Sequence, residues 1–157
     1  MTTVFTIQRR LIDLEKLITL GTVAANSAEY VPERFRDNQL PLFINVPLSA
    51  RRSKPADTFY LVNRAWRIDL WLRKEEDRLR SQNEYFCYQA LDEVYTFFNS
   101  RDRLELNGVG VTNLIEFFLE DDSGPQLQSF PASSSDDSLY YMIQFSARVT
   151  YRQLCTG

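Results

Sequence analysis

The stretch from Thr58 to Lys74, TFYLVNRAWRIDLWLRK, constrains the fold more than any other part of the chain. Strand side chains alternate between two faces, and this stretch alternates throughout, so it predicts one long strand. One face carries Tyr60, Val62, Trp66, Ile68, Leu70 and Leu72, and the other carries Phe59, Leu61, Asn63, Ala65, Arg67, Asp69 and Trp71. At about 3.3 Å per residue the strand reaches about 50 Å, whereas an ordinary strand measures about 17–20 Å.

Both faces of this strand carry large apolar side chains. Trp66 and Trp71 are an odd number of residues apart, which places them on opposite faces. A chain of 157 residues is too small to cover such a strand on both sides. We therefore expect a helix on one face and another subunit on the other, with Trp71 at that interface because aromatic residues are enriched in interface cores.

Two segments have the periodicity of helices. The first is predicted from about Thr3 to Leu20, with Gly21 as its stop signal. The second follows Lys74, opens with acidic residues that suit a helix amino terminus, and is expected to be the main core helix. Its apolar residues recur at spacings of three, four and seven: Leu79, Phe86, Ala90, Val94 and Phe97 or Phe98.

Further strands and loops complete the predicted order. Residues 40–49 (LPLFINVPLS) alternate, but Pro41 and Pro47 cannot donate ladder hydrogen bonds, so this strand belongs at a sheet edge. Residues 49–57 (SARRSKPAD) are predicted to be the flexible tip of a hairpin or arm. The turn signal NGVG at 107–110, followed by an alternating segment at 112–122, predicts a second hairpin.

The remaining segments are two polar connections and a last strand. Residues 22–39 are expected to form a long loop and residues 123–138 a mobile linker, and residues 139–152 alternate as a second overlong strand. The sequence as a whole predicts a single α+β domain over residues 1–157. Its mixed, mainly antiparallel sheet would have long strands packed against two helices, a hairpin arm and mobile loops.

Composition argues against most catalytic classes. The chain has no histidine, so imidazole and zinc chemistry are not expected, and a base that could activate Ser or Cys is missing. Cys87 lies within the apolar helix pattern and is expected to be a buried, inert thiol. Phosphate-binding glycine loops are absent, and acidic clusters such as Glu120-Asp121-Asp122 are expected to be solvated. We therefore predict no enzyme, no metal and no cofactor.

Charge and hydropathy indicate a soluble protein. The net charge of −3 gives no overall attraction to nucleic acid, and the only dense basic cluster is Arg51, Arg52 and Lys54. The amino terminus lacks the apolar core of a signal peptide, and no window reaches 18 apolar residues. We expect a protein of the reducing cytoplasm with no membrane association.

In order and pattern, the chain resembles the tail terminator (tail completion) proteins of long-tailed and contractile-tailed bacteriophages, the group of the lambda-type minor tail protein. The resemblance covers roughly residues 4–152. Four segments after the amphipathic amino-terminal helix carry it: WRIDLWL (66–72), ALDEVYTFF (90–98), LIEFFLEDDSG (114–124) and YYMIQFSARVTYR (140–152). The polar segments 22–39 and 123–138 are longer than a minimal member would need.

The resemblance implies a structural virion protein that assembles in the host cytoplasm as a hexameric ring. The ring would cap the head-proximal end of the tail tube, end tube polymerisation and join the tail to the neck. Its partners would be further copies of the chain, the tube protein, the neck or connector protein and, as a further candidate, the sheath. DNA would pass through the ring without sequence-specific binding.

The residues themselves indicate where such contacts would lie, since sheet edges and hairpin arms are the usual ring-forming elements. For subunit contacts we expect Phe59, Leu61, Trp71, Arg148 and Arg152. For contacts with tube or neck we expect Arg51, Arg52, Lys54, Asp121, Asp122, Gln126 and Phe130. Three other functions stay open: a neck protein or tube subunit of the same tail, a cytoplasmic adaptor that captures a peptide on its edge strand, and an enzyme with paired carboxylates.

Overall fold

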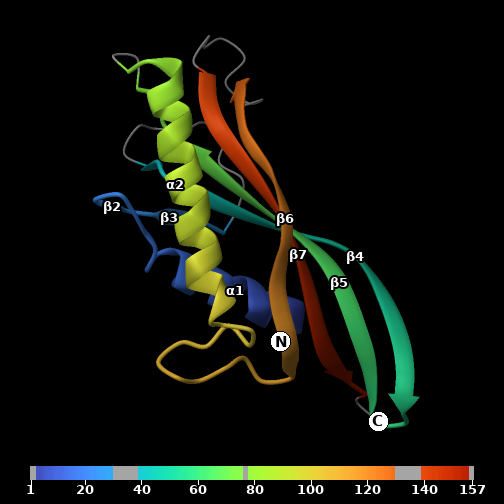
Figure 1. The fold of residues 1–157 in the computed structure, drawn as a ribbon. Coiled ribbons are helices and arrows are strands. Elements are labelled where there is room, and N and C mark those ends of the chain that lie inside the picture. The colour runs from blue at the N-terminus through green and yellow to red at the C-terminus, as the bar shows by residue number, and fades with distance from the viewer. Residues whose placement is uncertain (1–2, 30–38, 76–77, 130–138, 156–157) are drawn as a thin grey trace.

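The computed structural model describes residues 3–29, 39–75, 78–129 and 139–155. It is an α+β fold, which confirms the predicted class: a mainly antiparallel five-stranded sheet with two helices (Figure 1). In chain order the elements are α1 (Thr3–Glu15), β1 (Thr19–Leu20), β2 (Val23–Ala24), β3 (Asn26–Ala28), β4 (Leu42–Ala56), β5 (Phe59–Leu72), α2 (Arg80–Asn99), β6 (Leu114–Ser129) and β7 (Leu139–Leu154).

The large sheet has the strand order β3-β4-β5-β7-β6, and only the short β3–β4 pair is parallel. β5 pairs with β7 along its whole length, beginning with Phe59 opposite Leu154. These central strands contain 14 and 16 residues, so both predicted overlong strands are confirmed. β4 is paired on its outer side only over Leu42–Ile44, and from Asn45 onward it is the edge strand that its prolines predict.

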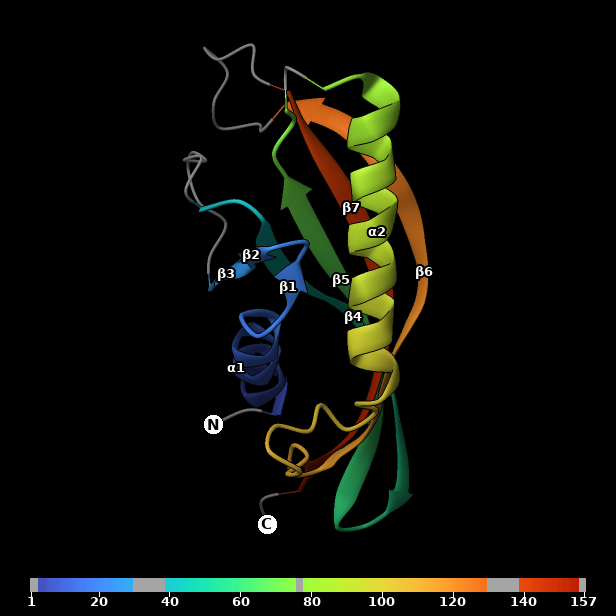
Figure 2. The same ribbon diagram turned by 60° about the vertical axis from the view of Figure 1, so that its left-hand side comes forward.

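Both helices lie on the same face of the sheet (Figures 1 and 2). Ile7 and Leu11 of α1 and Val94 and Phe98 of α2 join one buried cluster with the inward residues of β5 and β7, among them Trp66. The β7 residues on this face are all buried: Tyr141, Ile143, Phe145, Ala147, Val149 and Tyr151. The face that bears this cluster is called the core face below, and the opposite face the helix-free face.

A buried carboxyl group ties α1 to the sheet. Glu15, the last residue of α1, is completely buried, and its Oε1 accepts hydrogen bonds from Asn45 Nδ2 (2.6 Å) and Ser27 Oγ (2.9 Å). Its Oε2 has no hydrogen-bond partner among the described residues. Burial raises the pKa of Glu15 to about 8, although the two hydrogen bonds act in the opposite direction. The carboxyl group is therefore mostly protonated at neutral pH.

The hairpin of β4 and β5 extends beyond both helices and forms an arm, residues 48–64 (Figures 1 and 2). Residues 49–57 belong to a hairpin arm, as predicted, but most of them form a strand rather than its tip. β4 continues to Ala56, and only Asp57 and Thr58 connect it to β5. The basic residues are therefore held in a strand, because the long β5 supplies ladder partners as far as Phe59 opposite Ala56.

Both edge strands carry β-bulges. β4 has an extra residue between Pro47 and Ala50 and another between Ser53 and Ala56. β6 has three such irregularities against β7, within residues 114–116, 119–121 and 122–125. Bulges and prolines interrupt the row of free backbone groups on an edge, so neither strand offers a flat template for another strand.

The structure corrects three further boundaries. α1 ends at Glu15 rather than near Leu20, and Gly21 lies instead in the tight turn between β1 and β2 with a positive φ of 66°. NGVG does form a tight turn, in which Leu106 and Val109 exchange backbone hydrogen bonds, but β6 pairs with β7 instead of forming the predicted hairpin. Residues 123–129 of the predicted linker belong to β6, and residues 130–138 lie outside the described residues.

The main core helix is present, but it starts later than its apolar pattern implied. Leu79, predicted to be in the core, is 69% exposed and precedes α2, where the Gln82 side chain accepts a hydrogen bond from its N–H group. Ala90 and Val94 are buried as predicted. Cys87 is also buried, as predicted, and burial raises the pKa of its thiol to about 12.

Candidate assembly surface

The helix-free face is the face of the large sheet that neither helix covers. Paired residues in an antiparallel ladder point to the same face, so the registers define cross-strand rows. The row nearest the arm contains Arg51, Asn63, Thr150 and Glu116, from β4 to β6. Two other rows contain Ala65, Arg148 and Phe118, and Val46, Arg67, Ser146 and Asp121.

At one end, the helix-free face is apolar, and its side chains are already buried against one another within the same chain. A second buried cluster consists of Leu40, Leu42, Ile44, Trp71, Tyr140 and Met142. Trp71 is 5% exposed and packs edge-to-face with Tyr140 at a centroid distance of 6.4 Å. Trp66 and Trp71 thus lie on opposite faces, as predicted, but Trp71 has little surface left for a neighbouring subunit.

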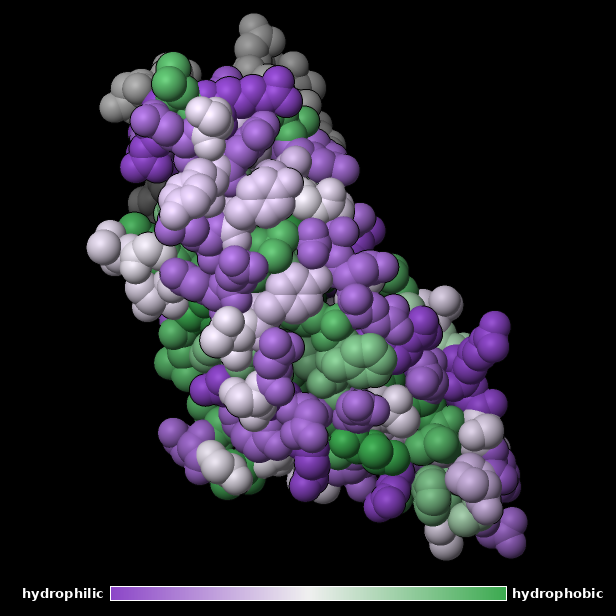
Figure 3. Space-filling view, viewed as in Figure 1, coloured by the Kyte–Doolittle hydropathy of each residue, from purple (hydrophilic) through white to green (hydrophobic). Residues whose placement is uncertain are grey.

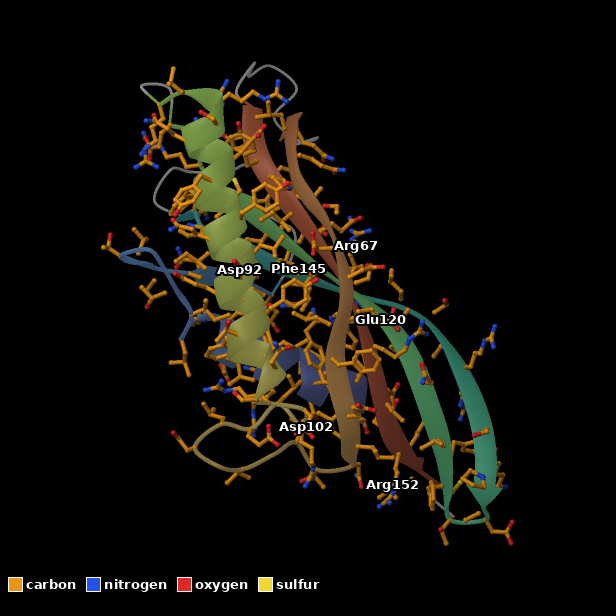
Figure 4. The ribbon with its side chains drawn as sticks, in the orientation of Figure 1. Arg67, Asp92, Asp102, Glu120, Phe145 and Arg152 are labelled. Carbon is orange, nitrogen blue, oxygen red and sulfur yellow. The ribbon has the colours of Figure 1, made fainter. Side chains whose placement is uncertain are left out.

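The middle of the helix-free face is a set of internally paired polar groups. Arg67 Nε lies 3.1 Å from Asp69 Oδ1, and Gln144 Nε2 donates a hydrogen bond to the same oxygen. Burial raises the pKa of Asp69, against the lowering effect of the Arg67 charge. Figure 4 places Arg67 and Glu120 on the side of the sheet away from α2, and Phe145 on the side of α2.

Arg148, predicted to contact another subunit, takes part in the same internal pairing. Its Nε donates to Glu120 Oε1 at 2.9 Å, and its Nη1 donates to Asn63 Oδ1 at 3.3 Å. Both partners come from the strands on either side of β7. Arg148 therefore links three strands of its own chain, with 38% of its side chain exposed.

At the arm, the helix-free face is apolar again but only partly covered. Phe59 and Leu61 are half-buried, and Leu154, opposite Phe59, is 58% exposed. The exposed Arg152 lies opposite Leu61, with its guanidinium carbon 5.4 Å from the centre of the Phe59 ring. Three of the predicted subunit contacts, Phe59, Leu61 and Arg152, are thus brought together here.

The basic residues of the arm divide between its two faces. Arg51 is paired with Asn63 and lies on the helix-free face, whereas Arg52 is paired with the buried Val62 and lies on the core face. The guanidinium carbon of Arg52 and Nζ of Lys54 lie 4.2 and 5.4 Å from the centre of the Tyr60 ring. In the space-filling view the arm protrudes, with hydrophilic and apolar residues both at its surface (Figure 3).

The residues predicted to contact tube or neck in and before the linker also lie on different faces of the sheet. Asp121 and Gln126 are exposed on the helix-free face. Asp122 is paired with Phe145 on the core face and accepts a hydrogen bond from the Tyr95 hydroxyl at 2.9 Å. Phe130 lies outside the described residues.

Sequence reasoning missed two residues of this surface, Glu116 and Phe118. Both are exposed on the helix-free face of β6, opposite Thr150 and Arg148. The alternation in LIEFFLEDD already placed them on one side of a strand. Only the pairing of β6 with β7 shows that this side is the helix-free face.

The described residues contain no group of three or more acidic or cysteine side chains arranged to hold a metal ion. A cleft of about 350 Å³ lies between the β1–β2 turn and the start of α2, lined by Arg73, Glu75, Arg78 and Phe86 among others. It contains neither cysteine, and so no nucleophilic thiol. The helix-free face with its arm, which carries both exposed apolar and charged side chains, is therefore the candidate functional surface.

No protein-family model matches the chain, and no curated protein matches its sequence. Within the described residues, neither helix is long and apolar enough to cross a membrane.

Proposed function

We propose that this chain is a structural subunit of a bacteriophage tail, a tail terminator that forms a ring at the head-proximal end of the tail tube. The observation that supports this most is a sheet whose helices cover one face only and whose arm extends beyond them. The resemblance of the sequence to tail terminator proteins points the same way. The proposed role is structural, with no reaction and no cofactor.

A sheet covered on one face suits a ring of identical subunits. In a ring each subunit meets its neighbours through two different surfaces, and the contacts close when the rotation per subunit divides a full turn. Here the arm and the β6 side of the sheet lie at opposite edges, on β4 and β6. Such surfaces can be used in sequence around a ring, and six subunits are the number that the resemblance implies.

The cap must bind the tube on one side and the neck on the other. For these axial contacts we keep Arg52 and Lys54, which are exposed beside Tyr60 on the core face of the arm, and Gln126 on β6. The partners are the tube protein and the neck or connector protein, and DNA passes through the ring. The protein would act in the virion after assembly in the host cytoplasm.

The alternative of a peptide-capturing adaptor has less support. Strand addition needs a regular row of free backbone groups at a sheet edge. The two edge strands carry bulges instead, and Pro47 and Pro125 remove two donors. A neck protein or a tube subunit would use the same kind of surface, so these two alternatives are separated by experiment.

Negative-stain electron microscopy of a phage whose copy of this gene is interrupted tests the proposal. Tails of uncontrolled, often excessive length beside filled heads are expected, because the tube keeps growing without a cap. Tails of normal length beside unattached heads would assign the protein to the neck, and the absence of any tube would make it the tube subunit. Intact virions would refute a structural role in the tail.

A further inference from the structure

The charges on the helix-free face are separated across the sheet. β4 contains three basic residues and no acid, whereas β6 contains four acids and no base: Glu116, Glu120, Asp121 and Asp122. Arg51 and Glu116 stand in the same row with two strands between them. Three strand spacings amount to about 14 Å, which exceeds the Debye length of about 8 Å at physiological salt. The two charges are therefore too far apart to neutralise each other within one chain.

The charges between them are already paired. Arg67 pairs with Asp69, and Arg148 pairs with Glu120. Four residues of this face make no ion pair within the part of the chain that the structure describes: Arg51, Arg152, Glu116 and Asp121. Arg51 lies on the arm and Asp121 on β6, whereas Arg152 of β7 lies two residues from Thr150, which is opposite Glu116. Unpaired charges of opposite sign therefore remain at the arm and on β6.

Each charged place surrounds an uncovered apolar group. At the arm, Arg51 and Arg152 flank the half-buried Leu61 and the exposed Leu154. On β6, Glu116 and Asp121 lie on either side of Phe118, which is 41% exposed. An apolar centre with a charged rim is the usual composition of a specific protein interface. The two places match in apolar character and are opposite in charge.

We propose that the helix-free face of the arm, with Arg51, Leu61 and Arg152, docks on Glu116, Phe118 and Asp121 of a second copy of this chain. The inference rests on the proposed ring, because it names the contact between neighbouring subunits. Bulges and prolines on both edge strands disfavour backbone pairing, so the contact forms through side chains. Each copy offers one arm and one β6 surface, so successive copies can join head-to-tail through this contact and close a ring.

The test uses charge reversal on the full-length chain. Arm variant R51E/R152E and strand variant E116K/D121K each place charges of one sign on both surfaces. The control R9E/K16E has the same formal net charge as the arm variant, −7 instead of −3, but alters exposed residues in and directly after α1, which packs on the other face of the sheet. Native mass spectrometry and light scattering at low and at physiological salt measure assembly of the 18.4 kDa chain over a range of concentrations.

The wild type and the control are expected to assemble alike, and the arm and strand variants each to require a concentration about tenfold higher or more. An equimolar mixture of the two variants should restore assembly, because each arm then meets a β6 surface of opposite charge. Alternating subunits close only in rings with an even number of members, so the mixture should form a ring of wild-type size if that ring is a hexamer.

Three results would overturn the inference, and they differ in what they say about the ring. If the arm variant assembles as readily as the wild type, or only as poorly as the control, the named contact is wrong and the ring stands. If the wild type stays monomeric at every concentration, self-assembly itself fails, and the proposed ring fails with the contact. Failure of the mixture to assemble, with both variants folded by circular dichroism, would also overturn the pairing of these two surfaces.

Discussion

Replacing Glu15 with glutamine should remove a pH dependence from the folding stability of this protein. In the folded chain, burial raises the pKa of Glu15 from 4.5 to about 8. Between these values the folded chain holds one more proton than the unfolded chain. The stabilising contribution is therefore complete below about pH 4.5, decreases as the pH rises, and is lost above about pH 8.

The size of the effect follows from this one proton. A difference of one bound proton changes the free energy of unfolding by about 1.4 kcal/mol per pH unit. From about pH 5.5 to about pH 7.5 the wild type should lose about 3 kcal/mol through Glu15. For a chain of this length that corresponds to a decrease in Tm of about 6–12 °C.

Urea unfolding followed by tryptophan fluorescence at three pH values between 5.5 and 7.5 measures the difference. The amide side chain introduced by E15Q keeps an oxygen that can accept the hydrogen bonds from Asn45 and Ser27, but it places an N–H group where Oε2 has no partner. That group costs about 1–3 kcal/mol at every pH, so the slope and not the absolute stability carries the test. The chain has no histidine, and the raised pKa of Asp69 affects both proteins equally.

The result that refutes this reasoning is a pair of parallel curves. If the difference in unfolding free energy between E15Q and wild type stays constant from pH 5.5 to 7.5, Glu15 is ionised in the folded protein. The carboxylate would then be stabilised by more than its two hydrogen bonds, and the attachment of α1 to β3 and β4 would have no pH dependence of its own.

Three further predictions concern single positions. A thiol reagent at pH 8 should modify Cys155 in the native protein and Cys87 only after unfolding, because Cys87 is buried with a pKa near 12; rapid labelling of both thiols would contradict this. Tyr95→Phe should lower the free energy of unfolding by about 1 kcal/mol through loss of the hydrogen bond to Asp122, and chemical denaturation with no change would refute it. Gly21→Ala should cost about 1–2 kcal/mol in the same measurement, because φ is +66° there and a Cβ atom would lie 3.3 Å from the Phe86 ring, and a neutral result would show that the turn relaxes.

The long strands could be predicted because their apolar residues repeat with period two along the core face. Every even-numbered position of β5 from Val62 to Leu72 except Arg64 is buried on the core face. The same pattern placed Trp66 and Trp71 on opposite faces. Alternation fixes which residues share a face, and the composition of each face then indicates which one the helices cover.

The extent of the edge strands could not be predicted, because it depends on neighbours distant in sequence. Residues 49–56 are polar and basic, and residues 123–129 contain Gly124 and Pro125, so both segments have loop composition. Each is a strand because a long central strand lies beside it, β5 for the first and β7 for the second. Ladder hydrogen bonds with such a partner outweigh weak intrinsic propensity.

The assembly surface was predicted in part for the same reason. Phe59, Leu61 and Arg152 lie on strands whose alternation was clear, and the structure brings them together at the arm. Glu116 and Phe118 required the register of β6, whose bulges shift its pairing with β7. Bulges leave no strong signal in composition, so the position of these residues relative to Arg148 could not come from the sequence.

A contact limited to the arm fits the helix-free face better than a second layer of protein that covers the whole sheet. Its central charged groups are paired and solvated, so covering them would cost desolvation without creating new bonds. One apolar end is already buried around Trp71, and the other, around Leu61 and Leu154, is not. Completing the burial of such half-exposed side chains stabilises a contact by about 1 kcal/mol each, similar to an exposed charge pair. A contact that combines apolar burial with charge pairs should weaken at high salt, because salt screens the charges, but the apolar part should keep it from disappearing.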